Sequence, residues 1–251
     1  ALYPLRLDVA NRVAGAALLL PKARRKVAAD LALDGMPLER AAATAVRLLD
    51  LGYFRIGNDY YADANGSFGL TTLERRHVRR HGASLAFGFV GKSGIEHHVT
   101  IEDRPVIEAL QVMRQRAGGD RLLAYRQGSE WLDLASGTVN AYLSELFGGD
   151  FTAKDFRTWH ATVLFAASLA LAPPADTKTS RARVVRTSVG EVATYLGNTP
   201  TVAKNSYIDP RIVDLYESGS TIEDAARRSY RTPAARQAAL EKALLQLLDL
   251  G

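Results

Sequence analysis

The sequence contains no cysteine. This absence excludes a disulfide framework, a thiolate metal site, an iron–sulfur cluster and a cysteine nucleophile, and it fits a reducing cytoplasm. Long apolar runs are also missing, since the longest run near the start, Val13–Pro21, is far too short to cross a bilayer. Basic residues flank this run, but no small-residue cleavage pattern follows it. We therefore predict one helix of a soluble protein there, and a cytoplasmic protein.

Histidine is scarce, with five residues in the chain. Two of them, His77 and His81, follow Glu74 at a spacing that would put all three on one face of a helix, as a metal site would need. The arginines of the same segment, Arg75–Arg80, repel a divalent cation. We predict no metal ion at these residues.

Nucleotide-binding and nucleophile-elbow motifs are missing as well. The sequence has neither GxGxxG nor GxxxxGK[ST], so it gives no support for a nucleotide cofactor. The segment GASLAFG, Gly82–Gly88, lacks the spacing of a GxSxG elbow and has the pattern of a strand. We predict that the protein uses no cofactor.

The charge balance is basic, although the composition is otherwise ordinary. The 251 residues include 32 Lys and Arg against 27 Asp and Glu, which gives a net charge of +5. Three segments concentrate the positive charge: Lys22–Lys26, Arg75–Arg80 and Lys178–Arg186. Three such clusters in one basic chain favour contacts with phosphates of a nucleic acid.

The apolar pattern predicts a mainly helical chain with a small antiparallel sheet, an α+β protein. The first fifty residues have helical spacing, and Gly52 would end that helical region. The apolar positions in question are Leu31, Leu33, Leu38, Ala42, Val46 and Leu49. Residues 53–100 have strand character, with the clearest hairpin at Ser84–Ile101 and its turn at GKSG.

Helical periodicity returns after Glu102. The helices predicted there cover Pro105–Arg116, Ser136–Leu146, Ala153–Leu171, Ser180–Leu196, Thr199–Ser206, Arg211–Ser218 and Pro233–Leu248. No internal repeat and no long linker interrupts the chain.

Four segments carry residues suited to phosphate chemistry. Arg55 stands among apolar residues in GYFRIGN, at a predicted strand start, and an arginine in such surroundings needs an anion. Lys92 is expected at the tip of the predicted hairpin. Arg157 lies in the first turns of a predicted helix, where backbone N–H groups favour an anion. In GNTPTVAKNSYID, Asn198 precedes a helix start and Tyr207 stands near that helix's end.

These segments, in this order, resemble the catalytic domain of a type IB DNA topoisomerase of the small poxvirus-like and bacterial form. The matching strings are LLDLGYFRIGN, FGFVGKSGIEHHV, KDFRTWHAT and VATYLGNTPTVAKNSYIDP, which lie between Leu48 and Pro210. The related tyrosine recombinases share the arginines and the tyrosine, but they usually have histidine where Lys154 stands here.

The resemblance implies a mechanism. Tyr207 would attack a DNA phosphodiester and form a 3′-phosphotyrosyl bond, while Arg55 and Arg157 hold the non-bridging oxygens. Lys92 would act as general acid on the leaving 5′ oxygen. Asn198, where the family often has histidine, would donate a hydrogen bond to a phosphate oxygen. No metal and no ATP are expected.

The resemblance also implies partners and organisation. Double-stranded DNA is the expected partner of a monomer at the nucleoid, and Lys154 and Lys204 are candidates for DNA contacts. Residues 1–251 are expected to form a catalytic domain without the β-rich N-terminal clamp domain. Two alternatives stay open: a site-specific tyrosine recombinase or integrase, and a basic DNA-binding protein without catalysis.

Overall fold

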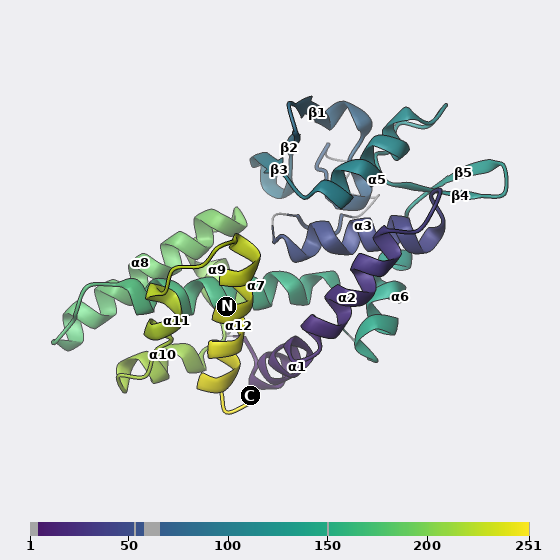
Figure 1. Cartoon of the computed structure of the whole chain (residues 1–251). Coiled ribbons are helices and arrows are strands. Elements are labelled where there is room, and N and C mark those ends of the chain that lie inside the picture. The colour runs from purple at the N-terminus through teal and green to yellow at the C-terminus, as the bar shows by residue number, and fades with distance from the viewer. Residues whose placement is uncertain (1–4, 53, 58–65, 150, 251) are drawn as a thin grey trace. The chain divides into compact units, whose positions relative to one another are not determined.

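The computed structural model describes residues 5–52, 54–57, 66–149 and 151–250 (Figure 1). The chain divides into two compact units. One unit combines Ala1–Leu20 with Arg157–Gly251, and the other is Pro21–Phe156. We call them the tyrosine unit and the hairpin unit, after Tyr207 and the β2–β3 hairpin described below. The mainly helical fold with small antiparallel sheets is confirmed.

The hairpin unit contains a three-stranded antiparallel sheet in the order β1-β2-β3. Its strands are β1 (Val78–His81), β2 (Ser84–Val90) and β3 (Glu96–Ile101). Alternate residues of β2, namely Leu85, Phe87 and Phe89, are buried, as the alternating sequence predicts. Val90 pairs with Glu96, so the predicted hairpin and its turn are confirmed.

Four helices accompany this sheet. They are α2 (Leu20–Leu31), α3 (Leu38–Asp50), α5 (Arg104–Gln115) and α6 (Ser136–Phe147). The start of α5 is fixed by Asp103, whose carboxylate accepts the N–H of Val106 at 3.3 Å. Gly148 ends α6 with a left-handed backbone, φ 69°.

A buried carboxylate joins three of these helices. The side chain of Asp50, at the end of α3, is only 4% exposed and accepts two hydrogen bonds of 2.8 Å from Arg24 of α2. Arg47 also reaches Asp50, at 3.2 Å, and continues to Asp103 at 2.8 Å. The network thereby ties α2, α3 and the first turn of α5 together immediately before the segment that carries Arg55.

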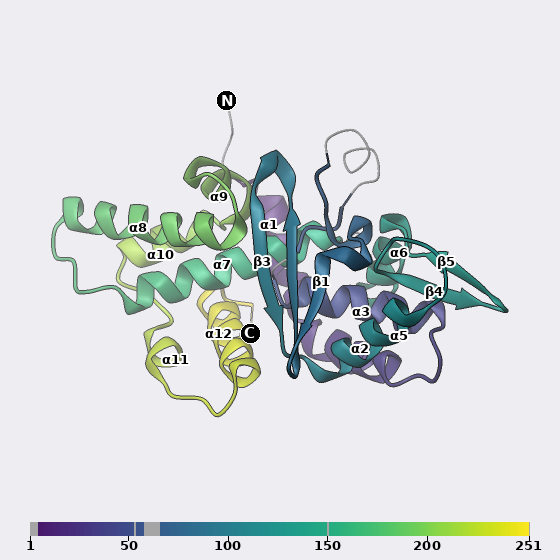
Figure 2. The ribbon, with the colours of Figure 1, turned by 90° about the horizontal axis from the view of Figure 1, so that it is seen from above.

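The tyrosine unit is helical in its described part. Its helices are α1 (Leu7–Ala17), α7 (Ala153–Leu171, from Arg157 on), α8 (Lys178–Leu196), α9 (Pro200–Tyr207), α10 (Arg211–Glu217), α11 (Glu223–Arg227) and α12 (Pro233–Leu247). Helices α7 and α8 lie side by side (Figure 2), and Ser168 Oγ donates to Ser188 Oγ across them at 2.7 Å. Thr199 caps α9, and Pro200 occupies its first turn.

Several local predictions were wrong. The single helix over Val13–Pro21 is two helices, because α1 ends at Ala17 and α2 begins at Leu20. Leu33 and Leu38 are exposed and do not belong to the buried face that Ala42, Val46 and Leu49 form.

The strand predicted around Arg55 is also absent from the described residues 54–57, which belong to no helix or strand. Tyr53 and residues 58–65 of the same prediction lie outside the described residues. Gly52 follows α3 with φ 86°, which agrees with its predicted helix-ending role.

The sequence analysis missed the second hairpin, β4 (Ala124–Gln127) with β5 (Glu130–Asp133), which projects from the hairpin unit (Figure 1). Its strands are four residues long, and half of their residues are polar, so they show little alternation. Among the described residues, no helix is long and apolar enough to cross a membrane.

Replacing Asp50 with Asn tests the buried network. The change removes the negative charge between Arg24 and Arg47, and we expect a loss of about 3 kcal/mol in the free energy of unfolding. Urea denaturation measures it. The control is Glu108→Gln, which removes an exposed partner of Arg104 and should cost less than about 1 kcal/mol. Equal costs for both variants would contradict a structural role for the network.

Candidate functional site

Arg157 lies against the ring of Tyr207. The guanidinium carbon of Arg157 is 5.6 Å from the centroid of the Tyr207 ring. Both residues belong to the tyrosine unit and both are buried, with exposed fractions of 4% for Arg157 and 8% for Tyr207. At this distance the guanidinium interacts favourably with the π-face of the ring.

The Arg157 guanidinium is positioned by the end of another helix. Its Nη2 donates to the carbonyl oxygen of Leu196 at 2.7 Å. Leu196 is the last residue of α8, so this carbonyl is one that lacks a partner within its own helix. This hydrogen bond therefore gives the last carbonyl of α8 a partner, and it also fixes the direction of the Arg157 guanidinium.

Thr162 holds the backbone at Tyr207. Its Oγ1 donates within α7 to the carbonyl of Thr158 at 2.9 Å and lies 3.2 Å from the carbonyl oxygen of Tyr207. Oγ1 of Thr162 also accepts the N–H of Asp209 at 3.1 Å. One buried hydroxyl on α7 thus contacts the chain on both sides of Ile208, where α9 ends.

The sequence analysis did not single out Thr162. A threonine inside the apolar run ATVLFAASLALA was the available signal, but a threonine in a helix also bonds to its own helix. Its second role depends on α9 packing beside α7, which no local pattern reveals.

Asp209 secures the next turn. Its buried carboxylate accepts the N–H of Arg211 at 3.0 Å and a forked contact from the Arg211 guanidinium. The hydrogen bond to Asp209 raises the pKa of Arg211 above its ordinary value. Arg211 also donates to Asn11 of α1 at 2.9 Å, so the turn after Tyr207 is bound to the first helix of the unit.

The remaining predicted residues of the tyrosine unit lie on either side of α9. Asn198 is half-buried between the end of α8 and Thr199, and its backbone N–H donates to Ala193 at 2.9 Å. Lys204 is exposed on α9, one turn before Tyr207. These positions agree with the predicted helix start and helix end.

Arg55 belongs to the hairpin unit and is half-buried. Its carbonyl accepts the N–H of Leu70 at 2.7 Å, and the carbonyl of Ile56 accepts the N–H of Thr71 at 2.8 Å. The loop is therefore held by backbone bonds to the 3₁₀ turn η1 (Leu70–Thr72), although it is not part of a strand.

Two glycines allow this pairing. A Cβ built on Gly69 would lie 2.4 Å from the Cα of Gly57 and 3.0 Å from the carbonyl oxygen of Arg55. Gly57 itself has φ 95°, which other residues rarely adopt. The close approach of the two backbones thus requires glycine at both positions.

Lys92 is exposed in the turn between β2 and β3, as predicted. The turn is the 3₁₀ segment η3 (Lys92–Gly94), in which Ser93 has a left-handed backbone, φ 65°. Gly91 closes it by donating to the carbonyl of Ile95 at 2.7 Å. Lys154, the last predicted residue, is exposed in the first turn of α7.

The described residues contain no group of three or more His, Cys, Asp or Glu side chains that could hold a metal ion. Glu74 and His77 are close because the N–H of Glu74 donates to Nδ1 of His77 at 3.0 Å. Burial and the positive charge of Arg76 lower the pKa of His77. The segment forms a 3₁₀ turn and a strand, so the helical face required for a three-residue metal site does not exist.

Comparison with known proteins gives one family match. The family model described as the catalytic core of eukaryotic DNA topoisomerase I matches residues 16–231.

Curated proteins are similar over shorter stretches. DNA topoisomerase 1B of Acanthamoeba polyphaga mimivirus is 29% identical over 172 residues, which are 65% of this chain and 51% of that protein. DNA topoisomerase 1 of Schizosaccharomyces pombe is 28% identical over 140 residues, 55% of this chain and 16% of that protein. DNA topoisomerase 1 of rabbit fibroma virus is 23% identical over 194 residues, 72% of this chain and 55% of that protein. The chain thus spans about half the length of the viral relatives.

Replacing Gly69 with Ala tests the contact that holds the Arg55 loop. The new methyl group must displace the backbone of Gly57, so we expect the free energy of unfolding to fall by about 1–3 kcal/mol. Gly137→Ala is the control, because Gly137 lies in α6 with open space around its Cα and alanine favours a helix. Denaturant unfolding measures the free energy of unfolding of both variants. A Gly69→Ala protein as stable as the wild type would contradict the close packing.

Proposed function

The chain belongs to the family of the catalytic core of eukaryotic DNA topoisomerase I, and on this premise we propose that it relaxes supercoiled duplex DNA as a type IB topoisomerase. One DNA strand is cut transiently and rejoined. The observation that carries the proposal is the contact between the buried guanidinium of Arg157 and the ring of Tyr207.

Tyr207 is the proposed nucleophile. As Tyr207 attacks, its phenolic proton is released to solvent water. Its phenolic oxygen forms a bond to phosphorus while the bond from phosphorus to the 5′ oxygen breaks. The products are a 3′-phosphotyrosyl bond and a 5′-hydroxyl.

Arginines stabilise the charge that develops on the phosphate. Arg157 and Arg55 donate forked hydrogen bonds to the non-bridging oxygens of the pentacoordinate transition state. Asn198 adds a neutral donor through its side-chain NH₂ group. The Arg157 guanidinium is anchored by the carbonyl of Leu196, and the backbone of Arg55 is held by its pairing with Leu70, which supports preorganised stabilisation.

Lys92 is the proposed general acid. Its ammonium group, exposed at the tip of the β2–β3 turn, gives a proton to the leaving 5′ oxygen. In the reverse reaction the 5′-hydroxyl attacks the phosphotyrosyl bond and returns this proton. The exposed Lys154 and Lys204 contact backbone phosphates of the duplex.

Cutting and rejoining conserve the energy of the phosphodiester, so no ATP is consumed. The arginines supply the positive charge that neutralises the phosphate, which magnesium does in other phosphoryl-transfer sites. While the 5′ end is free, the duplex turns about the intact strand and loses supercoils. One active site cuts one strand, so a monomer suffices for the reaction. The protein would act on the DNA of the nucleoid.

A plasmid assay tests the proposal. Negatively supercoiled plasmid in EDTA without ATP should be relaxed by the wild-type chain and left unchanged by Tyr207→Phe, which removes only the hydroxyl and keeps the ring beside Arg157. Tyr216→Phe, a change of the same kind on α10, should keep full activity. Agarose gels report the topoisomers.

Two further variants test the assignment of roles. Arg157→Ala should slow relaxation by about 10²–10³-fold, because it removes a donor to the transition state. Lys204→Ala should slow it less, because a backbone contact affects binding rather than the chemical step. Relaxation by Tyr207→Phe, or no relaxation and no covalent DNA adduct in the wild type, would contradict the proposal. Strand exchange between two duplexes would indicate a recombinase instead.

A further inference from the structure

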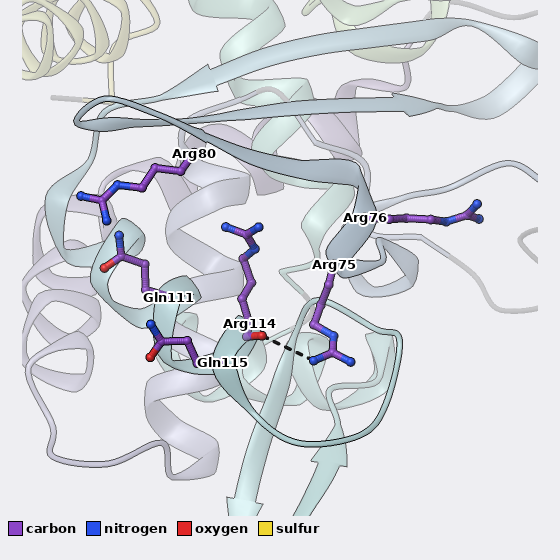
Figure 3. Close-up of a pocket in the computed structure, with 6 residues that line it drawn as sticks. All are labelled: Arg75, Arg76, Arg80, Gln111, Arg114 and Gln115. Carbon is purple, nitrogen blue, oxygen red and sulfur yellow. Dashed lines mark hydrogen bonds between the residues drawn. The ribbon is translucent and has the colours of Figure 1, made fainter.

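The hairpin unit has a basic pocket outside the residues assigned to the proposed reaction. It is a cavity of about 510 Å³, and no carboxylate is among the residues that line it. Four of the six lining residues are arginines. The lining residues are Arg75, Arg76, Arg80, Gln111, Arg114 and Gln115 (Figure 3).

Three elements build this pocket: α5, β1 and the 3₁₀ turn Arg75–His77, which carries Arg75 and Arg76. Gln111, Arg114 and Gln115 share one face of α5, because they are three and four residues apart. Facing them is β1, whose Val78 is buried and whose Arg80 lies on the same side of the strand. Arg114 Nη2 donates to the carbonyl of Val78 at 3.0 Å, which ties α5 to β1 and fixes the arginine at the pocket.

The arginines differ in what their donors already contact. Arg75 donates to the backbone carbonyls of Arg116, at 2.9 Å, and Gly119, so its role is structural. Arg76 is paired with Glu74 and points away from the others (Figure 3). The pocket's binding capacity therefore depends on the other two arginines.

Arg80 and Arg114 have donors to offer. Nε of Arg114 is buried and has no hydrogen-bond partner in the described part of the chain. Arg80 is exposed and uses Nε for the carbonyl of Gly82 at 3.1 Å, and none of the hydrogen bonds described involves its Nη atoms. Figure 3 shows Arg80, Arg114 and Gln111 gathered on one side of the pocket. Because Nε of Arg114 is shielded from solvent, an anion would instead meet the Nη atoms of Arg80 and the part of the Arg114 guanidinium that lines the pocket.

Positive charge is crowded in this part of the unit. The pKa of Arg116, which lies next to the pocket, is lowered by burial and by the charge of Arg75. Such crowding disfavours cations and favours an anion that carries more than one charge and several oxygen acceptors. The paired N–H donors of a guanidinium fit two oxygens of a phosphate group, and the side-chain amides of Gln111 and Gln115 add neutral donors.

We propose that the pocket between β1 and α5 is a phosphate-binding site, with Arg80 and Arg114 as its anchors and Gln111 and Gln115 as supporting donors. Its volume accommodates a chain of linked phosphates, either a free polyphosphate or a stretch of nucleic-acid backbone. The site is independent of the proposed function, because it uses neither Tyr207 nor strand cleavage.

Calorimetric titration of the full chain with tripolyphosphate, at fixed ionic strength, tests the site. We expect saturable binding in the wild type and a dissociation constant at least about tenfold weaker in Arg80→Gln. The matched control is Arg126→Gln. Arg126 is also an exposed strand residue of the same unit, and its Nε donates to a turn glycine, Gly128, at the same 3.1 Å. This control should bind tripolyphosphate within about twofold of the wild type.

Two outcomes would overturn the site. One is the absence of saturable tripolyphosphate binding by the wild type. The other is an equal loss in Arg80→Gln and Arg126→Gln, which would show a general effect of net charge.

The same variants identify the source of the phosphate. If Arg80→Gln weakens binding of a labelled DNA duplex more than Arg126→Gln does, and tripolyphosphate competes with the duplex, the ligand is a nucleic-acid backbone. If both variants bind the duplex equally while only Arg80→Gln loses tripolyphosphate, the ligand is a free polyphosphate. Both results support the site, and neither depends on DNA relaxation.

Discussion

The buried guanidinium of Arg157 is the constraint on which the tyrosine unit depends. A charge that is 4% exposed has to be compensated, and the carbonyl at the end of α8 and the face of the Tyr207 ring contribute to this. Arg157 therefore links three helices, α7, α8 and α9, at one point. The arrangement that stabilises the arginine is also the one that brings a cation to the proposed nucleophile, so stability and chemistry share the same contacts.

In the hairpin unit, the position of Arg55 depends on backbone contacts between two loop segments. Arg55 stands in a loop, and its backbone is held by two backbone hydrogen bonds and by the contact of Gly57 with Gly69. The buried Asp50 network lies immediately before this loop and fixes where α3 ends. The two backbone hydrogen bonds restrict the backbone at Arg55 although the segment belongs to no helix or strand.

Local sequence patterns predicted much of this organisation. Helix α7 spans Ala153–Leu171 as predicted, the β2–β3 hairpin has its turn at Lys92, and Tyr207 is the last residue of α9. The failures have a common physical cause. The contact of Thr162 with the turn after Tyr207, the pairing of the Arg55 loop with η1, and the shared pocket of Arg80 and Arg114 join residues distant in sequence. Periodicity reports which face of an element is buried, but not what it is buried against.

Covalent capture tests the central claim, that Tyr207 is the nucleophile, most directly. A duplex whose cleaved 5′ fragment is too short to stay paired traps the covalent intermediate, and trypsin then releases the peptide that carries the DNA. The account predicts DNA on the peptide Asn205–Arg211, whose single tyrosine is Tyr207, linked through a 3′ phosphate. An adduct on any other peptide, or a link through a 5′ phosphate, would contradict it.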